Sequence, residues 1–109
     1  MQESLHEIAK AVTNDVGAFA SRIDVDSLPF DQKERIEQLK RLTADVRLDC
    51  RDYQYAQTRQ EQLTSAAEAK QRLEQLNKLL LELSEHTIFS PADIAYFSAK
   101  IQQLRALLT

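Results

Sequence analysis

The sequence predicts an all-α protein, folded as an antiparallel four-helix bundle. The chain of 109 residues contains one glycine and two prolines, and neither residue type occurs between Pro29 and Pro91. Glycine supplies the positive φ that many turns require and proline interrupts helical hydrogen bonding, so their scarcity leaves few places for β-turns. Apolar residues recur at helical spacing in four successive segments. One apolar row per helix is typical of a bundle with one core, and we expect a single helical domain over residues 1–109.

The first helix is predicted over residues 4–23. Ser4 and Glu7 have the spacing of a capping box, in which the Ser and Glu side chains satisfy backbone N–H groups of the first turn. The apolar row consists of Leu5, Ile8, Val12, Val16, Phe19 and Ile23. Gly17 lies on a face of small residues in this helix, and that face suits either the core or an interface.

The one predicted loop covers residues 22–30. Its apolar residues Val25, Leu28 and Phe30 are expected to pack under the end of the bundle, with Phe30 as a hydrophobic staple for the next helix. The second helix is predicted over residues 31–61, with Asp31 near its start in a variant of the capping box. Its apolar row consists of Ile36, Leu39, Leu42, Val46, Cys50 and Tyr53.

The third helix is predicted over residues 65–87, because Ser65 and Glu68 repeat the capping-box spacing. Its apolar row is wide and consists of Ala69, Leu73, Leu76, Leu79, Leu80, Leu81 and Leu83. The fourth helix is predicted over residues 90–108. Ser90 and Asp93 form its capping box, and Pro91 stands at the first helical position, where its fixed φ suits the helix. Its row consists of Ile94, Phe97, Ile101, Leu104 and Leu108.

The join between the second and third helices allows two architectures. A tight turn near Thr64 gives a compact four-helix monomer. A continuous helix of about 55 residues, roughly 80 Å long, gives a long central helix with short flanking helices. Such a helix would leave half of its apolar row exposed unless the chain assembled as a dimer. The turn is the preferred prediction.

Charge and cysteine content limit the possible functions. The chain has 14 basic and 17 acidic residues, for a formal charge of −3. No basic stripe is present to neutralise phosphates, so we do not expect a nucleic-acid partner. Cys50 is the only cysteine and lies on an apolar row, which predicts a buried structural thiol. Neither a signal peptide nor a run long enough to span a membrane is recognisable, and we expect a cytoplasmic protein that does not contact membranes.

Two acidic pairs lie on the second helix. Glu34 with Glu37, and Asp49 with Asp52, are each one turn apart. Over residues 34–52 this pattern resembles the acidic signature of the all-helical nucleotide pyrophosphohydrolases of the MazG type, which implies Mg²⁺ held between two helices. The chain lacks the family's additional adjacent glutamate and has Asp where the family has the first Glu of the second pair. The pairs lie roughly 22 Å apart on one predicted helix, so we interpret them as a solvated face.

No metal, cofactor or catalytic residue is predicted. Glu3 and His6 have the spacing used in carboxylate-bridged metal bundles, but the second such motif is missing, because Leu83 stands three residues before His86.

The predicted function is that of a small, non-catalytic protein–protein interaction module, such as an adaptor, an assembly subunit or a dedicated chaperone. Candidate contacts with an unidentified protein partner are Tyr55, Leu79, Leu81, Leu83, Tyr96 and Phe97. A homodimer is expected as well, because the third helix is apolar over more than one face and so needs two neighbours. The alternatives are a Mg²⁺-dependent nucleotide pyrophosphohydrolase and a nucleic-acid-associated accessory protein.

Overall fold

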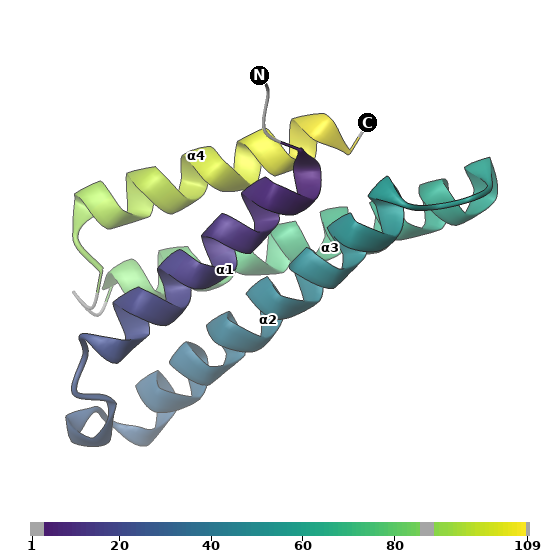
Figure 1. Cartoon of the computed structure of the whole chain (residues 1–109). Coiled ribbons are helices and arrows are strands. Elements are labelled where there is room, and N and C mark those ends of the chain that lie inside the picture. Colours follow the sequence, from purple (N-terminus) through teal and green to yellow (C-terminus); the bar gives the residue numbers. More distant parts are fainter. Residues whose placement is uncertain (1–3, 86–88, 109) are drawn as a thin grey trace.

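The fold is an antiparallel bundle of four α-helices, as the sequence predicts. The computed structural model describes residues 4–85 and 89–108, except for the side chain of Val25. Four helices and one short 3₁₀ turn make up the described part of the chain, in which no strand occurs; they are α1 (Leu5–Ser21), the 3₁₀ turn (Val25–Ser27), α2 (Phe30–Gln54), α3 (Arg59–Glu85) and α4 (Pro91–Leu107). Each helix packs against the next along the chain, and α4 packs back against α1. The four helices thus surround a common core (Figure 1).

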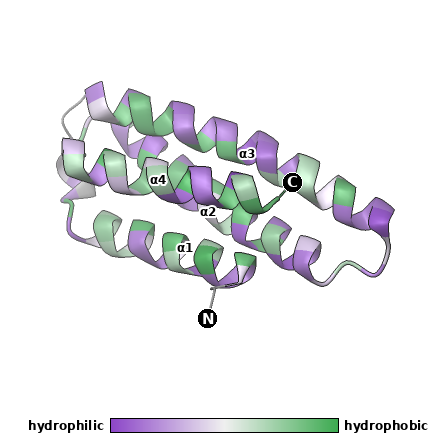
Figure 2. Ribbon diagram, turned by 90° about the horizontal axis from the view of Figure 1, so that it is seen from above, coloured by the Kyte–Doolittle hydropathy of each residue, from purple (hydrophilic) through white to green (hydrophobic). Residues whose placement is uncertain are grey.

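The predicted apolar rows form that core. Most of their side chains are buried, among them Ile36, Leu73 and Leu83, each exposed by 1% or less. Five row residues are partly buried and pack against the core; they are Phe19, Ile23, Leu42, Tyr53 and Ile94. Leu81 is the exception, because its side chain faces solvent. In Figure 2 hydrophobic and hydrophilic residues alternate around the helices, as the amphipathic pattern requires.

Two of the predicted capping boxes begin helices. The Ser4 hydroxyl accepts a hydrogen bond from the backbone N–H of Glu7 at 3.2 Å, and the Glu7 carboxylate accepts one from the N–H of Ser4 at 3.3 Å. Ser90 and Asp93 make the same reciprocal pair at 3.1 and 3.3 Å, with Pro91 as the first residue of α4. Local sequence alone therefore specifies where α1 and α4 begin.

The turn between α2 and α3 lies earlier than predicted. The second helix ends at Gln54 rather than 61, and the third begins at Arg59 rather than 65. Thr58 supplies the cap, because its hydroxyl accepts from the N–H of Glu61 at 3.1 Å and the Glu61 carboxylate accepts from the N–H of Gln57 at 3.2 Å. Thr58 and Glu61 have the capping-box spacing, so the sequence held a better start signal than Ser65, which lies inside α3.

The alternative of one long central helix is wrong, since the chain reverses direction between Gln54 and Arg59. The two central helices contain 25 and 27 residues, whereas α1 and α4 contain 17 each. The turn between α2 and α3 consequently projects beyond the ends of α1 and α4 (Figures 1 and 2). The backbone N–H of His6 donates to the side chain of Gln54 at 3.1 Å and fixes the start of α1 against the end of α2.

Two predictions for the residues around the start of α2 are wrong. Phe30 is not a staple packed under the bundle, because it is the first residue of α2 and its side chain is 77% exposed. Asp31 does not cap the helix, because Pro29 occupies the cap position without a side-chain hydrogen bond and Asp31 pairs with Arg35 instead. Leu28 does pack against the core, as predicted. The side chain of Val25 and the predicted helix end at residue 87 lie outside the described residues.

Candidate interaction surfaces

The six predicted contact residues separate into two groups. Leu79, Leu83 and Phe97 are buried in the core, with exposed fractions of 5% or less, and their side chains do not reach the surface. The wide apolar face of α3 is covered by α2 on one side and α4 on the other. The two neighbours that this face requires are therefore supplied by the same chain, and the predicted reason for a dimer no longer holds.

Tyr55, Leu81 and Tyr96 are exposed, but they lie on different parts of the molecule. Tyr55 follows α2 at the projecting turn, and Leu81 lies 22 residues after the start of α3, roughly 33 Å away along the helix. Tyr96 lies on α4, where its hydroxyl donates to the carboxylate of Asp15 on α1. These three residues therefore do not form a continuous contact surface.

A groove between α3 and α4 surrounds Leu81. Its volume is about 310 Å³. Leu73 and Ile101 contribute apolar side chains to the lining, while Leu81 is 55% exposed. Charged side chains lie at its edges, and Arg105 forms an ion pair with Glu74 across it at 3.5 Å. An apolar centre with a polar rim is the usual composition of a protein contact site.

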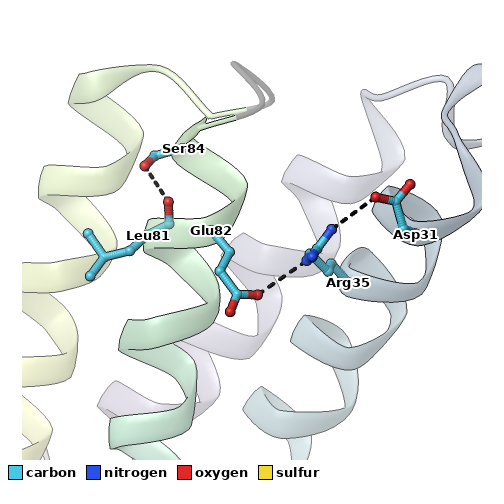
Figure 3. A network of polar contacts seen from close by, with 5 residues as sticks. All are labelled: Asp31, Arg35, Leu81, Glu82 and Ser84. Atoms are coloured by element: carbon cyan, nitrogen blue, oxygen red, sulfur yellow. Dashed lines mark hydrogen bonds and ion pairs between the residues drawn. The ribbon is translucent and has the colours of Figure 1, made fainter.

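The groove between α2 and α3 is polar in contrast. Arg35 lies at its centre and forms ion pairs with Asp31 at 3.3 Å and with Glu82 of α3 at 3.2 Å (Figure 3). The Asp31 carboxylate is exposed and that of Glu82 is about half-exposed, so each ion pair contributes little to stability. This network links the two helices through charged groups.

A second apolar hollow lies where the chain enters α4. It has a volume of about 570 Å³ and is lined by Phe89, Pro91 and Ile94 among others. Phe89 stacks on Phe19 with ring centroids 4.0 Å apart and meets Phe97 edge to face at 5.8 Å. This aromatic cluster closes the end of the core, so the hollow follows from the packing of α1 against α4.

The predicted acidic pairs are held apart by the uninterrupted course of α2. Glu34, Glu37 and Asp52 are exposed, whereas Asp49 is buried and forms an ion pair with Arg72 of α3. Among residues 4–85 and 89–108, no three His, Cys, Asp or Glu side chains lie together as metal ligands. Glu3 and His86, for which no metal site is predicted from the spacing of carboxylate-bridged metal bundles, lie outside the described residues.

Burial also determines the chemistry of Asp49 and Cys50. Desolvation raises the pKa of the Asp49 carboxyl above its usual 3.8, although the hydrogen bond from Arg72 opposes the shift. Desolvation, with a smaller effect from the Asp49 carboxylate, raises the pKa of the Cys50 thiol to about 12. A thiol with so high a pKa stays protonated at neutral pH and is a poor nucleophile.

Four exposed apolar residues were not predicted as contact residues. Phe30, Leu48, Leu63 and Leu107 have exposed fractions between 41% and 77%. Phe30 and Leu48 lie on α2, and Tyr55 directly follows this helix. The three residues are spaced by 18 and 7 residues, which are whole numbers of helical turns to within a small angle. This spacing was a signal in the sequence that analysis of the buried rows alone does not detect.

Comparisons with known proteins assign no family. No protein-family model, no curated protein and no solved structure matches the chain. Within the described residues, no helix is long and apolar enough to cross a membrane.

Proposed function

We propose that this protein is a small, non-catalytic protein–protein interaction module that binds its partner through exposed apolar helix faces. The observation that carries the proposal is the position of Leu81. Helix α3 contains six other leucines, and five of them are buried. Leu81 instead points out of the bundle beside the groove formed with α4. The core is filled without it, so stability does not require a leucine at this position.

The groove suits one face of an amphipathic helix or an extended segment with an apolar residue. An inserted apolar side chain would contact Leu81 and Ile101, and the charges of Lys78 and Arg105 would remain at the rim. Such anchors in a partly preformed hollow supply most of the binding energy in many interfaces. An adaptor, an assembly subunit or a dedicated chaperone would use a surface of this kind. We place the protein in the cytoplasm and expect it to self-associate as well.

The chemistry of the ionisable residues supports a non-catalytic role. The Cys50 thiol is buried and protonated, and Asp49 is occupied by Arg72. The remaining acidic residues of the pyrophosphohydrolase-like pattern lie on the exposed side of one helix. A shared ion would need carboxylates that converge on one point.

Affinity capture from the native host tests the proposal. The immobilised chain is compared with Leu81→Lys, which places a charge in the groove, and with Leu107→Lys, which places one on an exposed apolar position elsewhere on α4. We expect a protein that is captured by the native chain and by Leu107→Lys but is lost with Leu81→Lys. Capture that is identical with all three chains would contradict the role of the groove.

A hydrolysis assay tests the enzymatic alternative. The chain is incubated with nucleoside triphosphates and Mg²⁺, and released pyrophosphate is measured. We expect no turnover. Turnover that disappears in both Glu37→Ala and Asp52→Ala would overturn the non-catalytic assignment.

A further inference from the structure

A row of exposed residues runs along the side of α2 that faces away from the core. It occupies positions 30, 34, 37, 41, 44, 48, 51 and 55, and every one of these residues is exposed. The intervals alternate between three and four residues, which is the spacing of contact positions in a coiled coil. We call these eight residues the α2 outer row. Three of them are large apolar residues, namely Phe30, Leu48 and Tyr55, with exposed fractions of 77%, 41% and 67%.

The α2 outer row can pair with the same row of a second copy that runs in the opposite direction. Members at equal distances from the midpoint between residues 42 and 43 pair with one another in reverse order, and the two outer pairs of the four are chemically complementary. The outermost pair is aromatic, with Phe30 and Tyr55. The next pair has opposite charges, Glu34 and Arg51. A dimer with twofold symmetry brings each member of such a row against its matched member in the second copy.

We propose that two copies of this chain associate through the α2 outer row, with the two α2 helices antiparallel. The proposal names the second copy as one partner of the interaction module proposed above and rests on that function. It uses a different face from the groove at Leu81, so the two can succeed or fail separately. Figure 1 shows α2 along one edge of the bundle, with α1 and α3 as its neighbours on the inner side.

Charge decides the direction of the pairing. In the antiparallel arrangement Glu34 meets Arg51 of the second copy, and symmetry provides this pair twice. In a parallel arrangement Glu34, Arg41 and Arg51 would each face an identical residue. Like charges placed together at a contact oppose association strongly, because they lose water without gaining a partner. The antiparallel direction removes the clashes at Glu34 and Arg51, whereas the two copies of Arg41 lie about 4.5 Å apart along the helices, on either side of the twofold axis.

Apolar contacts define the ends and the centre of the proposed interface. Phe30 would stack on Tyr55 of the second copy at both ends, and aromatic pairs of this kind bury a large area. Near the centre, the small side chain of Ala44 faces Arg41, whose aliphatic stem covers it while the guanidinium stays in water. Leu48 faces the aliphatic part of Glu37. The 25 residues of α2 give the interface a length of roughly 37 Å.

The charges beside the row limit the affinity. Asp31 and Asp52 would lie on one edge and Lys40 and Arg47 on the other, and in this arrangement each edge meets an edge of the same sign. Asp31 and Lys40 are partly neutralised by ion pairs within the chain, to Arg35 and Glu37, both at 3.3 Å. Charges at an exposed rim affect affinity less than charges in the centre of a contact. We therefore expect a weak dimer in exchange with the monomer.

Sedimentation equilibrium over a wide range of protein concentration tests the proposal. The native chain is compared with Glu34→Arg, with Arg51→Glu, and with the double variant carrying both changes. Each single reversal places like charges together and should weaken dimerisation about tenfold or more. The double variant restores opposite charges and should recover most of the affinity. Lys10→Glu, a reversal on the exposed side of α1, is the matched control and should leave the affinity unchanged.

The variants carry exposed substitutions, and urea denaturation of each checks that the bundle still folds. A native chain that is monomeric at every concentration would overturn the proposal. A dimer whose affinity is not recovered in the double variant would overturn the antiparallel register. Leu81→Lys should leave dimerisation unchanged, so a failure of partner capture at the groove is distinguishable from a failure of this interface.

Discussion

The two sides of α2 differ in the way that their sequence pattern can be recognised. The inner side is mostly apolar, with Thr43 and Asp49 as its buried polar residues, and Ile36, Leu39 and Cys50 are exposed by 2% or less. The outer side contains apolar, acidic and basic residues in one row, which a hydrophobicity pattern averages away. Core packing needs only apolar side chains of suitable size, whereas a specific contact needs an order of different chemistries. The inner side can therefore be predicted from the sequence, whereas the outer side is recognised only when the exposure of each side chain is known from the structure.

Truncation of a leucine should lower stability far more on the inner side of α2 than on its outer side. Leu39→Ala removes a side chain that is 2% exposed and leaves a cavity, so it should lower the free energy of unfolding by about 3 kcal/mol. Leu48→Ala, the matched truncation on the outer side, should change it by less than about 0.5 kcal/mol. Urea denaturation below the concentration of dimer formation measures both. Equal effects of the two truncations would contradict the orientation of α2.

A smaller loss of stability is expected when the ion pair between α2 and α3 is broken. Arg72→Ala leaves the buried Asp49 carboxylate without its partner and should lower stability by about 2 kcal/mol at neutral pH. Arg105→Ala removes an exposed ion pair to Glu74 and should have an effect of less than about 0.5 kcal/mol.

The pH dependence of the Arg72→Ala effect has a definite sign. Burial raises the pKa of Asp49 in the folded chain, and loss of Arg72 raises it further. The folded state of the variant therefore binds a proton more readily than the unfolded state, and protonation favours folding. Denaturation at decreasing pH should show the deficit of Arg72→Ala shrinking. A deficit that does not change on acidification would indicate that Asp49 is solvated.

The stability of the chain at alkaline pH tests whether solvent is excluded from the inner side of α2. The pKa of the Cys50 thiol is raised from 9.0 to about 12 in the folded chain, so the unfolded chain loses this proton first. The contribution of Cys50 is complete below pH 9 and declines as pH rises toward 12. Between about pH 8 and about pH 10.5 the native chain should lose about 2 kcal/mol more stability than Cys50→Ala. Identical pH profiles would show that solvent reaches the thiol.

The smallest predicted effect lies on the outer side of α1. Gly17 is exposed, and a methyl group added there would meet no atom within 4 Å. Gly17→Ala should therefore raise stability by about 1 kcal/mol, because alanine is the better helix former and nothing has to move. Thermal denaturation of the two chains measures the change. A loss of stability would mean that this face is covered, and would favour the interface interpretation of the small residues.

The sequence predicts the fold and the first residues of two helices, and the reasons are local. Ser4 and Ser90 mark helix starts through reciprocal hydrogen bonds between residues three apart, and the apolar rows have the period of the helix. The capping-box spacing of Ser65 predicts the turn near Thr64, whereas Thr58 has the same spacing and caps the helix, so this spacing alone does not locate the turn. Tertiary packing decides between them, since Ala66 and Ala69 pack into the core beside α2.

The candidate contact surfaces were only partly predictable. Leu79 and Leu81 are two residues apart in the same leucine-rich segment, yet one is 5% exposed and the other 55%. Which of them faces out depends on where α4 lies, and no local pattern carries that information. Phe30 shows the same limit, because its exposure depends on the angle at which the chain enters α2.

Disulfide cross-linking tests the role of the outer side of α2 most directly. In a Cys50→Ala background, one chain carries Glu37→Cys and another carries Leu48→Cys, and the two are mixed under mildly oxidising conditions. The antiparallel register places these positions face to face, within the reach of a disulfide, whereas two copies of residue 37 lie roughly 16 Å apart along the helices. We expect a mixed dimer that contains one chain of each kind. Dimers formed only between identical chains, or no cross-linked product, would contradict this expectation.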